Sequence, residues 1–447
     1  MNDSAKRQSF FITTLGCPKN LVDSERLAAL LSRAGWRRKE APASADLVIV
    51  NTCGFIADAQ RESMEALVSA CALKEMGAVR RVTAMGCLVQ LEGKALCRQL
   101  PQLDLAVGVN DWPRLPRLLV CKGARAMRLH RSSPALGLTA TPRHALHRAH
   151  LRYLKIAEGC DCGCGFCVIP RIRGPQRSMS YVELLREARG LLQRNAKELV
   201  VVAQDSTAYG SDVPGSAGLP ALLRGLSETA SGAGERWIRV LYLHPSKITD
   251  TLLRVMAQRP VLPYFDLALQ HTSAKVLRSM RRPVPERGWE PLLESIRTLA
   301  PDAVLRATLL IGHPGETRSD FKQLLRFLEK VELDHVGAFL YSPQPGTPSA
   351  ARAAPASEEA AARMATLDEL LAEQAAQRVS RLIGTQTLVL VDGPSSDGAG
   401  VLARPWTDAP DIDWRYHLPV RARAGSFVEA VVVGGHPGSV ELEPIHA

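Results

Sequence analysis

Long apolar stretches are missing from this sequence of 447 residues. No segment approaches the roughly 18 consecutive apolar residues that a membrane-spanning helix requires. The first residues also lack the apolar core and the small-residue cleavage site of a secretion signal. We therefore expect a cytoplasmic protein that does not enter a membrane. The length exceeds what one hydrophobic core usually supports, which predicts two or three domains.

Acidic residues are fewer than basic residues in this chain. The chain contains 56 Lys and Arg residues against 45 Asp and Glu residues, which leaves a net charge of +11. Arginines gather in the stretches 143–152 and 415–423. Such an excess favours an anionic partner, and contact with RNA is one interaction of this kind. A solvated basic face of an arginine-rich protein explains the composition equally well.

Ten cysteines stand in a chain for which we expect reducing conditions, so metal binding or catalysis is favoured over disulfides. Three of them follow short predicted strands, and these are Cys17, Cys53 and Cys87 after residues 10–14, 46–50 and 81–84. In an open parallel sheet, ligands gather beyond the carboxyl ends of the strands, which allows these three thiols to converge. Cys71 lies in a helical pattern and is expected to be a buried structural residue.

The alternation of strands and helices predicts an α/β protein with three domains. Residues 1–131 form a parallel sheet covered by helices, and a basic linker follows at 132–150. Residues 151–384 contain six further strand-and-helix repeats, which predict a partial barrel. The expected strands of this barrel are 151–157, 198–203, 238–243, 264–269, 303–311 and 336–340.

The end of the chain differs in character. A helical pattern after Pro355, with Ser357 as its N-cap and Gly384 as its end, closes the central domain. Short strands between Gly, Ser and Pro turns then fill residues 385–447. They predict a small antiparallel β-barrel, a shape that often binds nucleic acid.

A glycine-rich loop at 159–167 carries four cysteines: Cys160, Cys162, Cys164 and Cys167. Electron-transfer clusters normally use four cysteine ligands, so a set of three leaves one iron open to bind and activate a substrate. The alternative is a zinc knot of all four thiols. Zinc sites usually combine two cysteines with a second, distant pair, which this chain lacks. We expect Cys162 not to be a ligand.

The spacing Cys160-x3-Cys164-x2-Cys167 resembles the signature of the radical S-adenosylmethionine (SAM) enzymes. In that family, the open iron of a [4Fe–4S] cluster binds SAM, and one electron cleaves SAM to a 5′-deoxyadenosyl radical. The segments 15–25, 51–56 and 85–87 resemble the three cysteine motifs of one branch, the methylthiotransferases. This resemblance implies a second, auxiliary [4Fe–4S] cluster on Cys17, Cys53 and Cys87, with an open iron that carries the sulfur to be transferred.

Segments 169–174, 269–271, 311–317 and 341–343 extend the similarity over nearly the whole chain. Two residues depart from the usual pattern of the family: Ala268 replaces a proline, and His313 replaces a phenylalanine. Three polar residues at or within the predicted strands face the expected SAM site, and these are Gln204, Gln270 and Arg306. Each is a candidate SAM contact, with a buried structural role as the equal alternative.

Two substrates compete within this branch: an adenosine in transfer RNA and an aspartate in a ribosomal protein. The segments 16–20, 202–210 and 408–413 resemble the ribosomal-protein enzymes of the RimO type. These modify S-twelve, a protein at the decoding centre of the small ribosomal subunit. The resemblance also makes the C-terminal barrel similar to the domain called TRAM, which would grip the protein substrate.

The resemblance further implies a reaction. The radical abstracts hydrogen from the β-carbon of the aspartate, sulfur comes from the auxiliary cluster, and a second SAM supplies the methyl group. An electron donor and a sulfur donor are implied partners, and no catalytic residues beyond the two clusters are expected. The alternative from another class is a non-enzymatic iron–sulfur protein that binds RNA or relays electrons. Three-cysteine sets argue against it, because a relay gains nothing from open irons.

Overall fold

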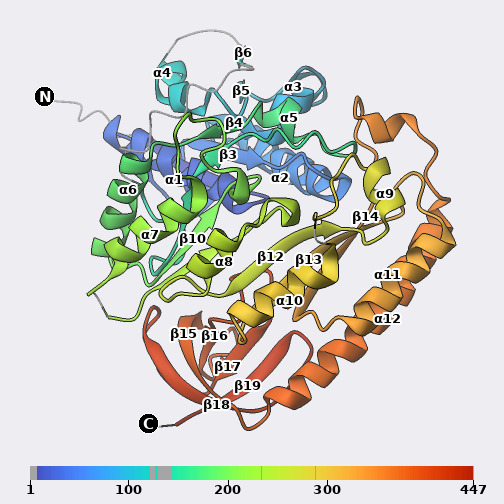
Figure 1. Cartoon of the computed structure of the whole chain (residues 1–447). Helices are drawn as coiled ribbons and strands as arrows, with labels where there is room; N and C mark the ends of the chain where they lie inside the picture. Colours follow the sequence, from blue (N-terminus) through green and yellow to red (C-terminus); the bar gives the residue numbers. More distant parts are fainter. Residues whose placement is uncertain (1–7, 121–125, 129–142, 233, 287, 446–447) are drawn as a thin grey trace, which may run out of the picture. The chain divides into compact units, whose positions relative to one another are not determined.

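The computed structural model describes residues 8–120, 126–128, 143–232, 234–286 and 288–445 (Figure 1). The chain divides into two compact units, and each draws on several segments. The first unit consists of Met1–His147, Lys155–Asp161 and Cys167–Glu187, and the second of Arg148–Leu154, Cys162–Phe166 and Ala188–Ala447. The domain boundaries expected from the sequence stay predictions. Residues 132–142 of the expected linker lie outside the described residues.

A six-stranded parallel sheet forms the centre of the first unit, in the order β2-β1-β3-β4-β5-β6. The predicted parallel sheet is therefore confirmed. Its strand β3 is buried along its whole length and reads as a nearly continuous apolar run, as expected of a strand covered on both faces. The strands are β1 (Ser9–Thr14), β2 (Arg37–Arg38), β3 (Leu47–Thr52), β4 (Arg81–Gly86), β5 (Leu105–Val107) and β6 (Ala126–Arg128).

Helices cover both faces of this sheet. Alternate residues of β3 point to opposite sides, so Ile49 joins a core with Leu27 of α1, whereas Val50 joins a second core with Leu67 of α2. The helices of this part are α1 (Pro18–Arg33), α2 (Ala57–Glu75), α3 (Cys87–Gln99) and α4 (Leu115–Val120). The first unit also contains α5 (Ile169–Arg173) and the antiparallel pair β8 (Ala157–Glu158) and β9 (Arg177–Ser178).

Six strands of the second unit follow one another in chain order. They form two three-stranded sheets, β11-β10-β7 and β12-β13-β14. Single parallel bridges, Ile238↔Val261 and Leu243↔Leu267, lie between the two sheets. This arrangement agrees with the predicted partial barrel. The strands are β7 (Leu151–Lys155), β10 (Glu198–Val202), β11 (Trp237–Val240), β12 (Tyr264–Gln270), β13 (Val304–Ile311) and β14 (His335–Leu340).

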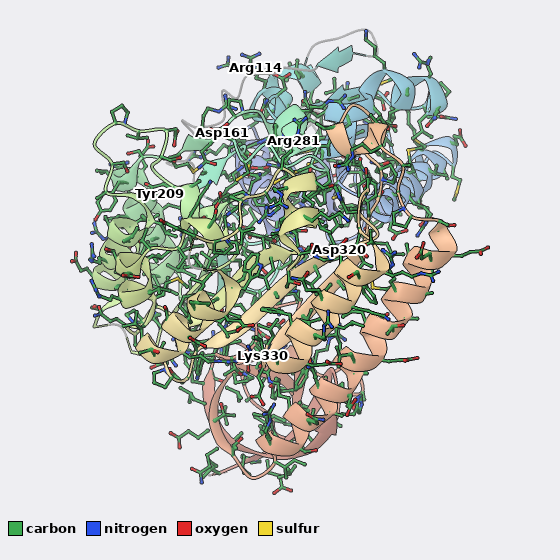
Figure 2. The ribbon with its side chains drawn as sticks, turned by 45° about the vertical axis from the view of Figure 1, so that its right-hand side comes forward. Arg114, Asp161, Tyr209, Arg281, Asp320 and Lys330 are labelled. Carbon is green, nitrogen blue, oxygen red and sulfur yellow. The ribbon has the colours of Figure 1, made fainter. Side chains whose placement is uncertain are left out.

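Three of the helices that follow these strands, α8, α9 and α11, begin at a residue whose side chain caps the helix. In α11, Thr317 and Asp320 form a reciprocal capping box at the first turn, and Lys330 lies in the last turn, where a cation is favourable (Figure 2). Helix α6 (Tyr181–Gln193) joins the two units in sequence. The other helices here are α7 (Gly218–Ala230), α8 (Asp250–Met256), α9 (Ala274–Ser279), α10 (Trp289–Leu299) and α11 (Arg318–Lys330).

Helix α12 (Ser357–Leu382) leads into the C-terminal barrel. The prediction that Ser357 caps this helix is wrong: the N-cap is Ala356, which offers no side-chain acceptor. Glu358 and Glu359 in the first turn interact favourably with the helix dipole instead. Among the described residues, none of the helices has the length and apolar character needed to cross a membrane.

Five short strands close into the predicted small barrel, in the order β15-β16-β17-β19-β18. Four of the pairings are antiparallel, but β17 pairs with β19 in parallel. The barrel is filled by inward-pointing apolar side chains such as Val389, Tyr416 and Val432. Its strands are β15 (Gln386–Pro394), β16 (Val401–Pro405), β17 (Arg415–Leu418), β18 (Phe427–His436) and β19 (Ser439–Pro444).

Candidate functional site

Three thiols of the first unit lie at the carboxyl edge of its sheet. Cys17 is the N-cap of α1 and lies three residues beyond the end of β1, Cys53 follows β3, and Cys87 is the first residue of α3 after β4. Because β1, β3 and β4 are neighbours in register, these residues emerge side by side. Space is tight there: a Cβ atom added to Gly16 would lie 2.8 Å from the Sγ of Cys53. The topology thus brings together cysteines that are far apart in sequence.

The three thiols are not gathered as tightly as the ligands of a single zinc ion. Two sulfurs on one zinc ion lie no more than about 4.6 Å apart, since each Zn–S bond is about 2.3 Å. Among the described residues, Cys17, Cys53 and Cys87 do not form a set whose ligand atoms all lie within 4.8 Å of one another. Ligation of a cluster by these residues stays a prediction.

Burial opposes ionisation of these thiols. It raises the pKa of Cys53, and it raises the pKa of Cys87 to about 12. Burial also acts against ionisation of Cys17, but the charges of Lys19 and Arg173 lower the pKa of this thiol below its usual range. Metal ligation requires thiolates, and a cationic cluster would supply the charge that offsets their burial. The donor set therefore fits an iron–sulfur group.

A buried polar network surrounds Cys87. The Nη2 of Arg173 donates to the Oδ1 of Asn20 at 2.6 Å and to the Sγ of Cys87 at 3.5 Å. The Nη1 of Arg173 donates to Glu158 at 2.7 Å, and Lys155 bridges Glu158 and Asp23. The sequence motifs contained Asn20 and Arg173 but assigned them no role. Both stand among other polar residues, such as Lys19 and Arg171, so nothing in the sequence singles them out.

The cysteine loop is shared between the two units, so its two parts are described separately. In the first unit, the backbone N–H of Cys160 donates to the carbonyl of Gly174 at 3.2 Å. Gly159 adopts a φ of +81°, and a Cβ atom there would lie 2.0 Å from the carbonyl oxygen of Pro175. Only glycine fits this position. Cys167 lies just before α5.

In the second unit, the thiol of Cys164 accepts a hydrogen bond from Arg282 at 3.3 Å, while burial raises the pKa of this thiol. Cys162 has a different environment. Its Sγ lies 3.2 Å from Oδ2 of Asp205 and 3.5 Å from Nζ of Lys247, which pair with each other at 2.6 Å. An ion pair therefore engages this thiol, and the expectation that Cys162 is not a ligand stays a prediction.

The three candidate SAM contacts lie in different settings. Gln204 follows β10, and Gln270 ends β12 with a φ of +67°, a strained backbone conformation that is often found at functional sites. Arg306 lies within β13 and forms ion pairs with Asp266 at 3.1 Å and Asp413 at 3.2 Å. These pairs favour the structural alternative for Arg306. Contact of all three residues with SAM stays a prediction.

The two departures from the family pattern have packed environments. His313 is fully buried, and its Nε2 lies 2.8 Å from the hydroxyl of Ser349. Its ring meets Phe166 edge-on at 6.1 Å between centroids. Burial lowers the pKa of His313 to about 4, so this ring is neutral at neutral pH. Ala268 lies in β12 and accepts a hydrogen bond from Arg282 through its carbonyl.

One further group resembles a metal site in its composition. Among the described residues, His335, Asp408 and Asp413 bring three possible ligand atoms within 4.8 Å of one another. Arginines already neutralise it: Arg306 pairs with Asp413, and Arg378 lies 2.8 Å from the Nε2 of His335. The group is a buried ion-pair network, and a cation there would meet two guanidinium groups.

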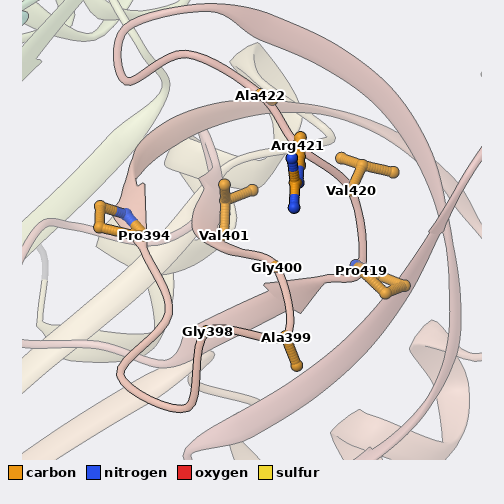
Figure 3. Close-up of a pocket in the computed structure, with 9 residues that line it drawn as sticks. All are labelled: Pro394, Gly398, Ala399, Gly400, Val401, Pro419, Val420, Arg421 and Ala422. Atoms are coloured by element: carbon orange, nitrogen blue, oxygen red, sulfur yellow. The ribbon is translucent and has the colours of Figure 1, made fainter.

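A pocket of about 600 Å³ opens at one end of the C-terminal barrel (Figure 3). Its lining is mainly apolar or glycine, and Arg421 is its only charged side chain. The lining residues are Pro394, Gly398, Ala399, Gly400, Val401, Pro419, Val420, Arg421 and Ala422. This pocket contains neither thiols nor an acid–base pair, so it is not a candidate for the chemistry.

The stretch 143–152 is less basic at its surface than its sequence indicates. Arg143 is buried in ion pairs with Glu25 and Glu187, and Arg148 pairs with Asp411. Arg152 is only 4% exposed. This stretch therefore offers an anionic partner few free charges.

Two family models match the sequence. Residues 9–108 match the uncharacterized protein family UPF0004, and residues 154–328 match the radical SAM superfamily. A protein of Anaeromyxobacter sp. (strain K) called ribosomal protein uS12 methylthiotransferase RimO is 40% identical to this chain, over 90% of this chain and 86% of that protein. A protein of the same name from Desulforudis audaxviator is 38% identical, over 97% and 96%.

This chain belongs to the RimO family. The comparisons confirm the predicted radical SAM methylthiotransferase of the ribosomal-protein type, and with it the requirement for SAM and [4Fe–4S] clusters. Among solved structures, the radical SAM methyltransferase TsrM from Kitasatospora setae is similar, with a TM-score of 0.57, 14% identity and 77% coverage of each chain. At that identity the likeness concerns the fold alone, and it agrees with the predicted fold class.

Proposed function

We propose that this protein inserts sulfur and a methyl group at the β-carbon of an aspartate in ribosomal protein uS12, which is S-twelve of the small ribosomal subunit. The observation that carries this proposal is membership of the RimO family over nine-tenths of the chain. The meeting of Cys17, Cys53 and Cys87 at one sheet edge supports it, because the reaction needs a sulfur carrier besides the radical source.

In this proposal, Cys160, Cys164 and Cys167 hold the cluster that binds SAM, and Cys17, Cys53 and Cys87 hold the auxiliary cluster. When bound, these groups supply the radical chemistry that an inert sp³ C–H bond requires and the sulfur that replaces its hydrogen. The chain's own residues shape the sites. Arg282 donates to Cys164, and Arg173 donates to Cys87, so a guanidinium lies beside one thiol of each set.

The proposal includes partners. Reductive cleavage of SAM consumes one electron, which an electron donor must supply, and each turnover removes a sulfur atom that a sulfur donor must replace. A second SAM acts as an ordinary methyl donor. We place the protein in the cytoplasm, where ribosomes are made and work. Contact with ribosomal RNA is supported by exposed arginines of the C-terminal barrel, Arg415, Arg421 and Arg423.

The decisive experiment deletes the protein from its cells and measures two modifications by mass spectrometry. We expect the methylthio group to disappear from the aspartate of uS12 and the methylthioadenosine of transfer RNA to remain. Re-expression of the intact chain should restore the mark, whereas the matched Cys87→Ala chain should not.

Loss of the mark from transfer RNA alone would replace the proposed substrate with adenosine. Unchanged marks on both substrates would instead favour a non-enzymatic iron–sulfur protein. Purified protein reconstituted with iron and sulfide gives a second measurement. Two clusters correspond to about eight irons per chain, so a content of about four would contradict the two-cluster arrangement.

A further inference from the structure

Helix α5 (Ile169–Arg173) connects the two predicted ligand sets within the first unit. It begins two residues after Cys167, a predicted ligand of the SAM cluster. Its apolar side packs against a predicted ligand of the auxiliary cluster, since Val168 and Ile172 form one buried group with Cys87 and Val109. The packing of this helix therefore places its last residue, Arg173, next to Cys87, and the hydrogen bonds of Arg173 hold it there.

The guanidinium of Arg173 is fixed on several sides. The residue is 1% exposed, and its donors reach Asn20 at 2.6 Å, Glu158 at 2.7 Å and the Sγ of Cys87 at 3.5 Å. Asn20 in turn donates to the carbonyls of Leu15 and Thr52, which belong to the two other cysteine segments. The side chain thus lies within the frame that orients all three thiols.

Charge around this guanidinium is balanced without the thiols. Arg173 and Lys155 supply two positive charges, and Glu158 and Asp23 supply two negative charges. The guanidinium nevertheless places a positive charge directly beside the thiol of Cys87. An arginine stays charged at every pH that the fold survives, so this cation is permanent.

We propose that Arg173 is a positioning residue for the auxiliary cluster: it orients Cys87 and stabilises the reduced, more negative cluster, and so raises the reduction potential. Hydrogen bonds to cluster sulfurs and the nearby net charge are the levers by which a protein sets such a potential. The inference rests on the proposed function, because it assumes that Cys17, Cys53 and Cys87 hold a cluster. It goes beyond that function by naming the residue that controls the cluster's electronic state.

The test is a redox titration of the full-length chain that carries Cys160→Ala, Cys164→Ala and Cys167→Ala, which should retain the auxiliary cluster alone. Electron paramagnetic resonance follows its one-electron reduction by dithionite. In this background, we expect Arg173→Met to lower the equilibrium constant for reduction at least tenfold, which corresponds to a midpoint about 59 mV more negative. Arg173→Lys should shift the midpoint less, because it retains the charge but not the planar fork.

A second variant guards against misfolding. Arg173→Met alone leaves two buried carboxylates facing Lys155, so Arg173→Met combined with Glu158→Gln keeps the remaining charges balanced. The negative shift should persist, since the donor at the sulfur is still lost. The matched control is Arg143→Met with Glu25→Gln, which removes another buried ion pair of the same unit and should leave the midpoint unchanged.

The outcomes separate the inference from the function on which it rests. A parent chain that binds no iron after loss of the three loop cysteines would overturn the proposed auxiliary site itself. A parent with a normal cluster, whose midpoint is the same in all Arg173 variants, would overturn only the role of Arg173. Equal shifts in the Arg173 and Arg143 double variants would also overturn it, because a general effect of core substitutions would then explain the result.

Discussion

The two predicted cluster sites of this protein are built in different ways. Cys160, Cys164 and Cys167 lie in one short loop, and glycines such as Gly159 let its backbone turn tightly. Cys17, Cys53 and Cys87 each stand at the end of a different strand, and only the order of β1, β3 and β4 in the sheet brings them together. The first site is thus encoded by local spacing, and the second by topology.

Their surroundings differ as well. Both sites place an arginine against a thiol, Arg282 at Cys164 and Arg173 at Cys87. The sheet-edge site lies in a network of ion pairs, whereas the loop combines the charged partners of Cys162 and Cys164 with the neutral ring of His313, which meets Phe166 edge-on. A buried ion pair offsets the desolvation of its charges only when its geometry is good, whereas a buried neutral histidine becomes unfavourable when it is protonated. We therefore expect the two sites to respond differently to substitution and to pH.

Removal of one ligand from each site gives the largest expected effects. Cys164→Ala should abolish SAM cleavage, and Cys87→Ala should leave SAM cleavage intact but abolish sulfur transfer. Each should lower the iron content from about eight to about four per chain, because one cluster is lost. SAM cleavage is measured as 5′-deoxyadenosine by chromatography. If Cys164→Ala still cleaved SAM, the loop would not be the radical site.

A glycine substitution should disable the loop site selectively. Gly159→Ala places a Cβ atom 2.0 Å from the carbonyl of Pro175 at a φ of +81°, so the loop must shift or the fold must strain by about 1–3 kcal/mol. We expect loss of the loop cluster with retention of the auxiliary one, as measured by iron content and electron paramagnetic resonance. Gly35→Ala is the matched control, because Gly35 has a φ of +90° but no atom within 4 Å of the added Cβ. Equal iron loss in both variants would mean that backbone strain alone, and not the clash with Pro175, causes the loss of the cluster.

Acidification should weaken the surroundings of the loop through His313. Burial lowers the pKa of His313 to about 4, against about 6.5 in the unfolded chain. Between about pH 6.5 and pH 4, His313 is therefore protonated in the unfolded chain but not in the native state. The free energy of unfolding falls as the pH falls through this range. His313→Phe should cost about 1 kcal/mol at pH 7 through its lost hydrogen bond, yet lose less stability on further acidification.

The measurement is urea unfolding of both chains at pH 7 and pH 5. His244 and His271 also have a pKa lowered to about 4 by burial, so the variant should retain part of the pH dependence. The exposed His436→Phe serves as the control and should follow the parent chain. If the free energy of unfolding fell equally between pH 7 and pH 5 in the parent chain and in the His313 variant, the role assigned to this ring would be wrong.

The smallest effect is expected at Cys162. Since its thiol contacts Asp205 and Lys247, Cys162→Ala should leave the iron content and SAM cleavage nearly unchanged. Cys71→Ala, at a buried thiol of α2, is the control for simple loss of a sulfhydryl group. A loss of about four irons in Cys162→Ala alone would make Cys162 a ligand and reopen the question of which three thiols form the set.

Strand positions were predicted closely because buried parallel strands read as short apolar runs. The expected strand at 264–269, for instance, is β12 (Tyr264–Gln270). Helix ends were harder: Ser357 has the composition of a cap, but the chain enters the helix at Ala356. The basic stretch 143–152 wrongly indicated a charged surface. Its sequence does not reveal that Arg143 is paired with Glu25, which lies far away along the chain.

The sequence by itself determined the family, the fold class and the candidate ligands, because the spacing of thiols and the runs of apolar residues can be seen directly in the sequence. Only the tertiary structure decided what surrounds the thiols. Arg173 reaches Cys87 because α5 packs on that side of the first unit, and Cys162 is engaged because Asp205 and Lys247 follow other strands. Such contacts join residues that are distant in sequence, and they are selected by packing and charge balance in space.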